Sequence, residues 1–188
     1  YAPRTLEAPG EEGLVIALEE LDCVTFVENV LALARLVQTA PDEVLVGRAG
    51  ARQRALFSGL LEDIRYRGGV LDEYPSRLHY FSEWIKDNDA MGLVRDVSRE
   101  LGGVADDEPI DFMTTHPDAY RQLGEDPAFL PKLEEVEARL SAEPRYYIPE
   151  DRINSVEDQI RDGDIIAATS TVAGLDIAHT GIALWRDG

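Results

Sequence analysis

Cysteine is nearly absent from this sequence, since the 188 residues contain only Cys23. A single cysteine excludes a disulfide within the chain. It also excludes the thiolate-rich zinc sites, which need several cysteine ligands. The three histidines lie far apart in the sequence, and there is no His-Glu-x-x-His motif. The sequence therefore indicates no metal site, and we expect no cofactor.

Long apolar runs are missing too. No stretch approaches the roughly 20 consecutive apolar residues of a membrane-spanning helix, so we expect no membrane insertion. The sequence contains no signal peptide. It opens at Tyr1 and stops at Gly188 within a strand-like run, so we expect a chain that has been trimmed at both ends. Its length predicts a single domain, residues 1–188, with enough apolar residues for a core.

Positive charge is scarce as well. Lysine and arginine number 18 against 37 aspartates and glutamates, which gives a formal net charge of −19. Such a chain is repelled by the phosphates of nucleic acids and by anionic membrane surfaces. The acidic residues are spread along the whole chain, and this is typical of a solvated surface. We therefore expect no nucleic-acid partner.

The first half of the sequence has mainly helical patterns. Residues 23–39 and 51–65 carry apolar residues at three- and four-residue spacing, which predicts two helices. Pro41 would end the first, and Gly68 and Gly69 would follow the second. The first of these helices should bury the apolar residues Phe26, Val27, Val30, Leu31, Ala34 and Val37. A third helix is predicted within "PSRLHYFSEWIKDN", with Ser76 as its N-cap.

The second half mixes strands and helices. "IDFMTTH" alternates weakly, like a strand that ends at His116, and residues 127–140 have a helical period. "GDIIAATST" and "IAHTGIALW" are β-rich runs joined by the short connection "VAGLD", which predicts an antiparallel hairpin. Helices followed by an antiparallel sheet define an α+β fold, with the N-terminal helices packed on the sheet.

Cys23 has two interpretations. Asp22 is a favoured N-cap residue, so Cys23 would occupy the first helical position, where the unpaired N–H groups and the helix dipole favour an anion. A thiolate there is a nucleophile. The neighbouring carboxylate of Asp22 opposes this effect, so a histidine partner would be needed. The alternative is that Cys23 simply packs, as most free cysteines do.

His179 is the candidate partner. It begins "HTGIALW", the strand that follows the hairpin connection, and Gly181 would let a substrate or another segment approach that strand. A cysteine at a helix start and a distant histidine on a strand form the order of papain-type catalysis, in which the two residues meet only in the fold.

These residues carry a family resemblance. "LDCVTFVENV", "GDII" and "HTGIALW" resemble the NlpC-type papain-like peptidases that act on bacterial cell walls. "YPSRLHYFSEWI", "LGG", "DFMTTHPDAY", "YYIP" and "GLDIAHTGIAL" are similar to the N-acetylmuramoyl-L-alanine amidase-like branch of that superfamily. The resemblance covers nearly the whole chain. It implies a papain-like fold and a location in the bacterial periplasm or cell envelope.

The resemblance also implies catalytic roles. Cys23 matches the nucleophile and His179 the general base. Tyr1 is the match for a tyrosine that helps to form the oxyanion hole, although it lies further from the cysteine than in the typical pattern. The third polar residue of such triads follows the histidine by about a dozen positions, so we expect it beyond Gly188.

Substrate-binding candidates come from the segments outside these motifs. The third helix resembles the family pattern and contains four candidates, Ser76, Arg77, Tyr80 and Trp84. The side chains of Arg77, Tyr80 and Trp84 would share one face and hold a sugar ring and a carboxylate. The alternative is a helix at the edge of the core with an arginine that reaches solvent. His116 and Asp176 are further candidates. Asp176 has the alternative role of shaping the hairpin turn.

The activity implied by the resemblance is hydrolysis of the amide between N-acetylmuramic acid, preferably its 1,6-anhydro form, and L-alanine. The substrate would be a muropeptide released by cell-wall turnover, and no metal is needed. Two alternatives remain open. One is an endopeptidase that cleaves between D-glutamate and a diamino acid of the stem peptide, and the other is a non-catalytic module that binds muropeptides.

Overall fold

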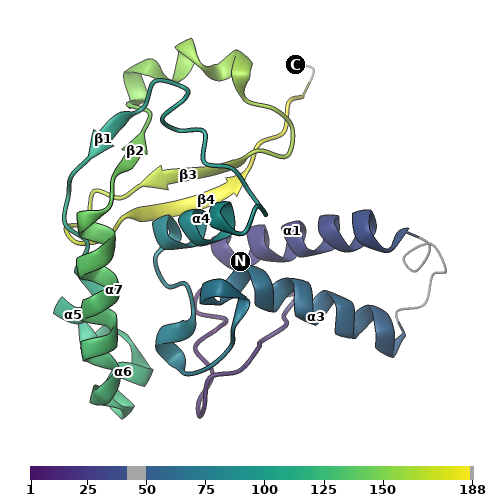
Figure 1. Ribbon diagram of the computed structural model, residues 1–188, viewed down its shortest axis with the longest axis vertical. Helices are drawn as coiled ribbons and strands as arrows, with labels where there is room; N and C mark the ends of the chain where they lie inside the picture. The colour runs from purple at the N-terminus through teal and green to yellow at the C-terminus, as the bar shows by residue number, and fades with distance from the viewer. Residues whose placement is uncertain (42–49, 187–188) are drawn as a thin grey trace. The chain divides into compact units, whose positions relative to one another are not determined.

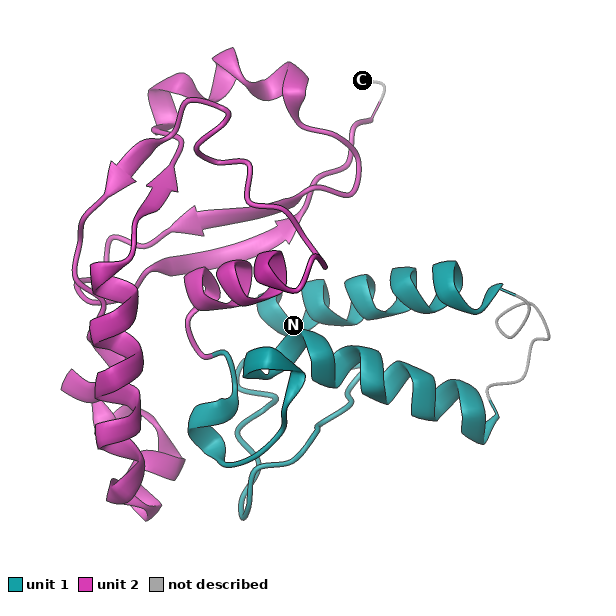
Figure 2. Ribbon diagram, in the orientation of Figure 1, with its two compact units in different colours: residues 1–78 teal, residues 79–188 magenta. Residues whose placement is uncertain are grey.

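The computed structural model describes residues 1–41 and 50–186 of the chain. These residues form two compact units, Tyr1–Leu78 and His79–Gly188 (Figure 2). The expectation of one domain over residues 1–188 stays a prediction, because compactness alone does not decide whether either unit functions without the other.

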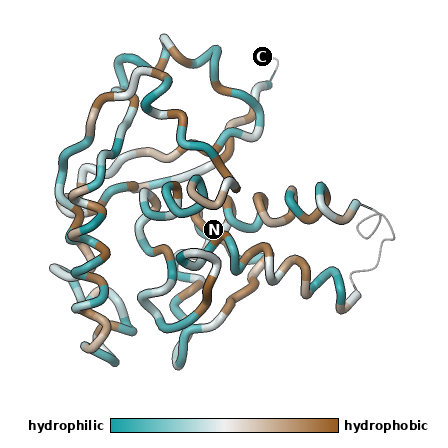
Figure 3. The backbone as a smooth tube through the Cα atoms, viewed as in Figure 1, coloured by the Kyte–Doolittle hydropathy of each residue, from teal (hydrophilic) through white to brown (hydrophobic). Residues whose placement is uncertain are grey.

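The first unit is built on two helices that lie side by side, α1 (Cys23–Thr39) and α3 (Ala51–Arg65) (Figure 1). Both predicted helices are confirmed, and α1 ends before Pro41 as expected. Hydrophobic stretches recur along both (Figure 3). Each fully buried aliphatic or aromatic side chain contributes about 1.5–3 kcal/mol to the stability of such an interface. The buried apolar residues of the pair are Val27, Ala32, Leu36, Phe57, Leu61 and Ile64.

The face of α1 predicted to be buried is largely exposed. Phe26, Val30 and Val37 keep 41%, 36% and 50% of their surface in contact with solvent, and Ala34 is exposed as well. The prediction is therefore wrong for these four residues. A helical period shows that one face is apolar. It does not show which residues of a broad apolar face meet the neighbouring helix.

The second unit contains four α-helices among its described residues. They are α4 (Phe81–Ala90), α5 (Phe112–Thr115), α6 (Arg121–Glu125) and α7 (Leu130–Ala142) (Figure 1). The helix expected at 127–140 is confirmed, although its first residues, Pro127–Phe129, form a 3-10 turn. Further 3-10 turns span Arg67–Gly69 and Tyr74–Ser76 in the first unit and Pro117–Ala119, Glu150–Ser155 and Glu157–Gln159 in the second.

Two small antiparallel sheets complete the second unit. β1 (Val104–Asp106) pairs with β2 (Arg145–Tyr147), a pair that the sequence analysis missed. β3 (Ile165–Thr169) pairs with β4 (Ile177–Ile182), which confirms the predicted hairpin. His179 faces Ala168 in the register. The sequence predicted His179 as the first residue of its strand. Because β4 begins at Ile177, His179 is instead its third residue.

The third predicted helix is confirmed as α4, but its predicted start is wrong. Arg77 is extended and forms an antiparallel bridge with Tyr66, so the helix begins only at Phe81 and Ser76 does not cap it. The strand predicted for residues 110–116 is wrong, because Phe112–Thr115 form the short helix α5. The hydroxyl of Thr115 donates to the carbonyl of Asp111 over 2.7 Å and closes this turn.

The combination of helices with small antiparallel sheets confirms the α+β class. Within residues 1–41 and 50–186, no helix has the length and apolar character required to span a bilayer.

Candidate functional site

Cys23 is the first residue of α1, as the sequence predicts. The Asp22 carboxylate accepts the backbone N–H of Thr25 over 2.8 Å, and the Thr25 hydroxyl accepts the backbone N–H of Asp22 over 2.9 Å. This reciprocal capping box fixes where the helix begins. Cys23, which is half-buried, therefore lies in the turn where the helix dipole favours negative charge.

Tyr1 is a neighbour of Cys23. The backbone N–H of Ala2 donates to the carbonyl of Leu21 over 3.0 Å, which ties the start of the chain to the residues before α1. The negative charge of the Cys23 thiolate raises the pKa of the Tyr1 phenol, and the nearby Asp22 carboxylate raises it further. The phenol therefore stays protonated at neutral pH and can donate a hydrogen bond.

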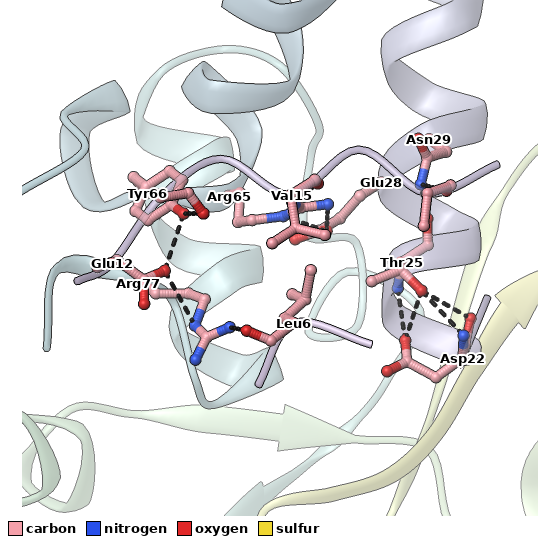
Figure 4. Close-up of polar contacts among 12 residues, drawn as sticks. Leu6, Glu12, Val15, Asp22, Thr25, Glu28, Asn29, Arg65, Tyr66 and Arg77 are labelled. Carbon is pink, nitrogen blue, oxygen red and sulfur yellow. Dashed lines mark hydrogen bonds and ion pairs between the residues drawn. The ribbon is translucent and has the colours of Figure 1, made fainter. Parts of the chain in front are cut away.

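A buried ion pair holds α1 to α3 beyond this turn. Glu28 lies on α1 five residues after Cys23. Its Oε2 atom is 2.8 Å from both Nε and Nη2 of Arg65 (Figure 4). Arg65 also donates to the carbonyl of Val15 over 2.6 Å. Burial raises the pKa of Glu28, although Arg65 opposes this effect. The pair fixes α1 against both α3 and the N-terminal segment.

His179 lies on β4 with its side chain exposed. Thr180, the next residue, is buried and donates its hydroxyl to the carbonyl of Ile166 over 3.0 Å, which fastens the strand around the histidine. A Cβ added at Gly181 would meet no heavy atom of the described chain within 4 Å. Cys23 and His179 belong to different units, so their pairing stays a prediction.

Arg77 is buried within the first unit, with 4% of its surface exposed. Its guanidinium donates to the Leu6 carbonyl over 2.9 Å and lies 3.5 Å from the Glu12 carboxylate (Figure 4). It also donates to the Glu7 carboxylate over 2.8 Å. It also stacks over the Tyr74 ring. Arg77 therefore neither lies on a helix nor reaches solvent, as the structural alternative expected, and its contacts hold the N-terminal segment to the first unit. A role in binding substrate stays a prediction.

The Ser76 hydroxyl is engaged within its own turn, where it accepts a hydrogen bond from the backbone N–H of Asp72 over 3.1 Å. Tyr80 and Trp84 lie in the second unit, and each is only 1% exposed. The Tyr80 hydroxyl donates to Glu137 over 2.6 Å and accepts the backbone N–H of Met113 over 2.9 Å. Trp84 stacks on Phe81. The helix face that Arg77 was expected to share with these aromatics does not form, because α4 starts after Tyr80.

His116 and Asp176 have local partners as well. The exposed ring of His116 stacks on Phe112, and its Nδ1 lies 3.1 Å from the Phe112 carbonyl. Asp176 is 8% exposed, and its carboxylate accepts the backbone N–H of Ser82 over 2.7 Å. Asp176 therefore caps α4, a helix whose own preceding residue, Tyr80, makes no side-chain cap. Burial raises the pKa of Asp176.

The second unit also contains a cavity of about 390 Å³ that the sequence analysis did not predict. Asp176 is the one predicted site residue among its lining residues. Its walls are the hairpin connection and the residues around β1 and β2, so no local pattern could have signalled it. The lining consists of residues 106, 108–110, 145, 147 and 169–176. Over the described part of the chain, no three His, Cys, Asp or Glu side chains are grouped as a metal site would need.

The model of the AmiA-like family, described as N-acetylmuramoyl-L-alanine amidase-like, matches residues 1–188. A search of curated proteins found no match. Among solved structures, an N-acetylmuramoyl-L-alanine amidase from Bacteroides uniformis is 38% identical with a TM-score of 0.88, and the match covers 100% of this chain and 76% of that one.

A second solved structure, a putative xylanase from Bacteroides fragilis, is 34% identical with a TM-score of 0.85. Here the match covers 100% of this chain and 78% of that one. Because the family model matches all 188 residues, the chain belongs to the AmiA-like, N-acetylmuramoyl-L-alanine amidase-like family.

Proposed function

We propose that this chain is a cysteine-dependent N-acetylmuramoyl-L-alanine amidase with a papain-like, NlpC-type arrangement of its catalytic residues. The substrate is a muropeptide, preferably one with a 1,6-anhydro sugar. The observation that carries the proposal is the family match over the whole chain together with Cys23 at the capped start of α1. The activity belongs to peptidoglycan turnover, in the bacterial periplasm or cell envelope.

The first half of the reaction forms a thioester. The Cys23 thiolate attacks the lactyl carbonyl of the sugar, and the resulting oxyanion needs hydrogen-bond donors. The Asp22 carboxylate already engages the N–H of Thr25, so the donors at this helix start are the N–H groups of Cys23 and Val24. The phenol of Tyr1 is a third hydrogen-bond donor to the oxyanion. The C–N bond then breaks, and protonated His179 gives its proton to the leaving amine of L-alanine.

The second half consumes water. His179, now neutral, takes a proton from a water molecule that attacks the thioester. The sugar leaves as a free lactyl carboxylic acid, and Cys23 returns to its thiolate form. His179 thus acts first as an acid and then as a base.

The experiment compares two peptides. Anhydro-N-acetylmuramyl-L-alanyl-D-glutamyl-diaminopimelate should be split into the sugar acid and an intact peptide that begins with L-alanine. The same peptide without its sugar should be inert, because a site built to hydrogen-bond a missing group rejects the analogue strongly. Mass spectrometry identifies both products.

The same digestion decides between the alternatives. Release of L-alanyl-D-glutamate from the sugar-free peptide would establish the endopeptidase and refute the amidase. Binding of both peptides without any product would establish a non-catalytic module.

A further inference from the structure

The cavity in the second unit has one rigid wall, the connection between β3 and β4. The backbone N–H of Ser170 donates to the Asp176 carbonyl over 2.8 Å, and the Ser170 hydroxyl accepts the N–H of Val172 over 3.0 Å. The Gly174 carbonyl accepts the N–H groups of Asp111 and Phe112, each over 3.1 Å. The Ser170–Asp176 bond therefore closes the connection at its two ends, and the bonds from Asp111 and Phe112 fix its middle at Gly174.

Gly174 is required in this wall. Its φ is +79°, and a Cβ there would lie 2.2 Å from Oδ1 of Asp111. A side chain there would displace the Asp111 carboxylate, and the positive φ would strain the backbone. Thr169 and Thr171 on the same connection are exposed and line the cavity.

The facing wall does not provide a cation for an anionic ligand. Arg145 is 7% exposed and donates to the carbonyls of Leu140 and Glu108. Its Nε lies 3.7 Å from the Asp106 carboxylate and has no hydrogen-bond partner among the residues that the structure describes. With Glu108 and Asp176 also in the lining, carboxylates outnumber the one guanidinium. An acidic group would therefore be repelled.

The remaining groups suit a neutral ring with many hydroxyls. Carboxylates accept hydrogen bonds from hydroxyl groups, and threonine hydroxyls both donate and accept them. Tyr147, 37% exposed, supplies an aromatic surface. A volume of about 390 Å³ falls within the usual range for small-molecule sites.

We propose that this cavity binds the neutral N-acetylated sugar ring of the substrate, an inference that rests on the proposed function. Its position fits, because Thr169 in the cavity wall follows Ala168, the register partner of His179. The cavity wall therefore adjoins the strand pair that carries His179, since one residue along a strand spans about 3.3 Å.

The test uses two small probes and the whole chain, labelled with ¹⁵N. Methyl N-acetyl-β-glucosaminide, which has no lactyl group and no peptide, should shift the amide signals of residues 169–176 in a saturable way. Nα-acetyl-lysine amide is the cationic control and should leave these signals unchanged. Shifts with the lysine derivative alone would overturn the proposal in favour of a cation site. Shifts elsewhere or none with the sugar would also overturn it.

A pair of matched variants tests the cavity in catalysis. Ala173→Trp fills the cavity, whereas Ala138→Trp places the same bulk on an exposed position of α7. Ala173→Trp should lower kcat/KM for the anhydromuramyl peptide at least about tenfold more than Ala138→Trp does. Equal effects would refute the inference.

The two proposals fail in different ways. If sugar binding is seen but no peptide is hydrolysed, the proposed activity is wrong and the cavity remains a sugar site. If the peptide is hydrolysed but the sugar probe leaves residues 169–176 unaffected, the amidase stands and the ring binds elsewhere.

Discussion

The backbone N–H of Ala2 donates to the carbonyl of Leu21 over 3.0 Å, and this bond holds Tyr1 beside the turn that begins with Cys23. Tyr1 is 88% exposed, so its phenol contributes little to the core. A residue placed this way can stabilise an oxyanion without supporting the fold.

Tyr1→Phe should therefore lower kcat by about 10²-fold, the usual loss when one oxyanion donor is removed. The melting temperature should stay unchanged. Ala2→Pro removes the N–H that ties the segment and should lower kcat as well, whereas Ala2→Ser keeps that N–H and serves as the control. Equal kcat values for Tyr1→Phe and the wild type would remove Tyr1 from the mechanism.

Asp176 provides a prediction about pH. Burial raises its pKa in the folded state, so the native protein binds more protons than the unfolded chain at pH values above the ordinary aspartate range. Its contribution to stability therefore falls as the pH rises through that window. Asp176→Asn keeps an acceptor for the Ser82 N–H and removes the charge, so its melting temperature should depend less steeply on pH.

Asp176→Ala separates the cap from the charge. This variant loses the acceptor at the start of α4 and should be destabilised by about 1 kcal/mol relative to Asp176→Asn. Urea unfolding at one pH measures the difference. Equal stabilities of the two variants would mean that Asp176 does not cap α4.

Arg77→Ala should mainly affect stability. It leaves the carboxylates of Glu7 and Glu12 partly or fully buried without their cation, and breaking such a pair costs about 3–5 kcal/mol. Arg95→Ala, which removes an exposed arginine with one ion pair of 3.5 Å, is the control and should change stability little. A large loss of kcat/KM at an unchanged melting temperature would instead support the substrate-binding role predicted from the sequence.

The net charge of −19 should make stability sensitive to salt. Repulsion among the acidic side chains disfavours the compact state. Because the Debye length falls from about 30 Å at 0.01 M to about 3 Å at 1 M, sodium chloride should raise the melting temperature over that range. Calorimetry provides the measurement, and a flat or falling curve would contradict the prediction.

Local signals predicted the parts of this protein that local interactions build. The start of α1 was predicted because Asp22 and Thr25 satisfy each other within one turn. The hairpin was predicted because two β-rich runs flank a short connection that contains Gly174. Cys23 and His179 were placed on a helix start and a strand by the same kind of reasoning.

Contacts between distant residues were not predictable from one sequence. The carboxylate of Asp176 caps a helix that begins 95 residues earlier, which left no trace in the pattern around Ser76. The partners of Arg77 lie about 70 residues away, so its position next to aromatic residues suggested a shared helix face instead. β1 and β2 have three residues each, too few for a visible alternation.

The most direct test of the central claim is the turnover of an anhydromuramyl peptide by Cys23→Ala. The account predicts that this variant folds with a circular-dichroism spectrum like that of the wild type. It should release sugar acid and L-alanyl peptide at least about 10³-fold more slowly, as expected when a catalytic nucleophile is lost. A folded Cys23→Ala protein that still splits the sugar–alanine amide at the wild-type rate would show that Cys23 is not the nucleophile.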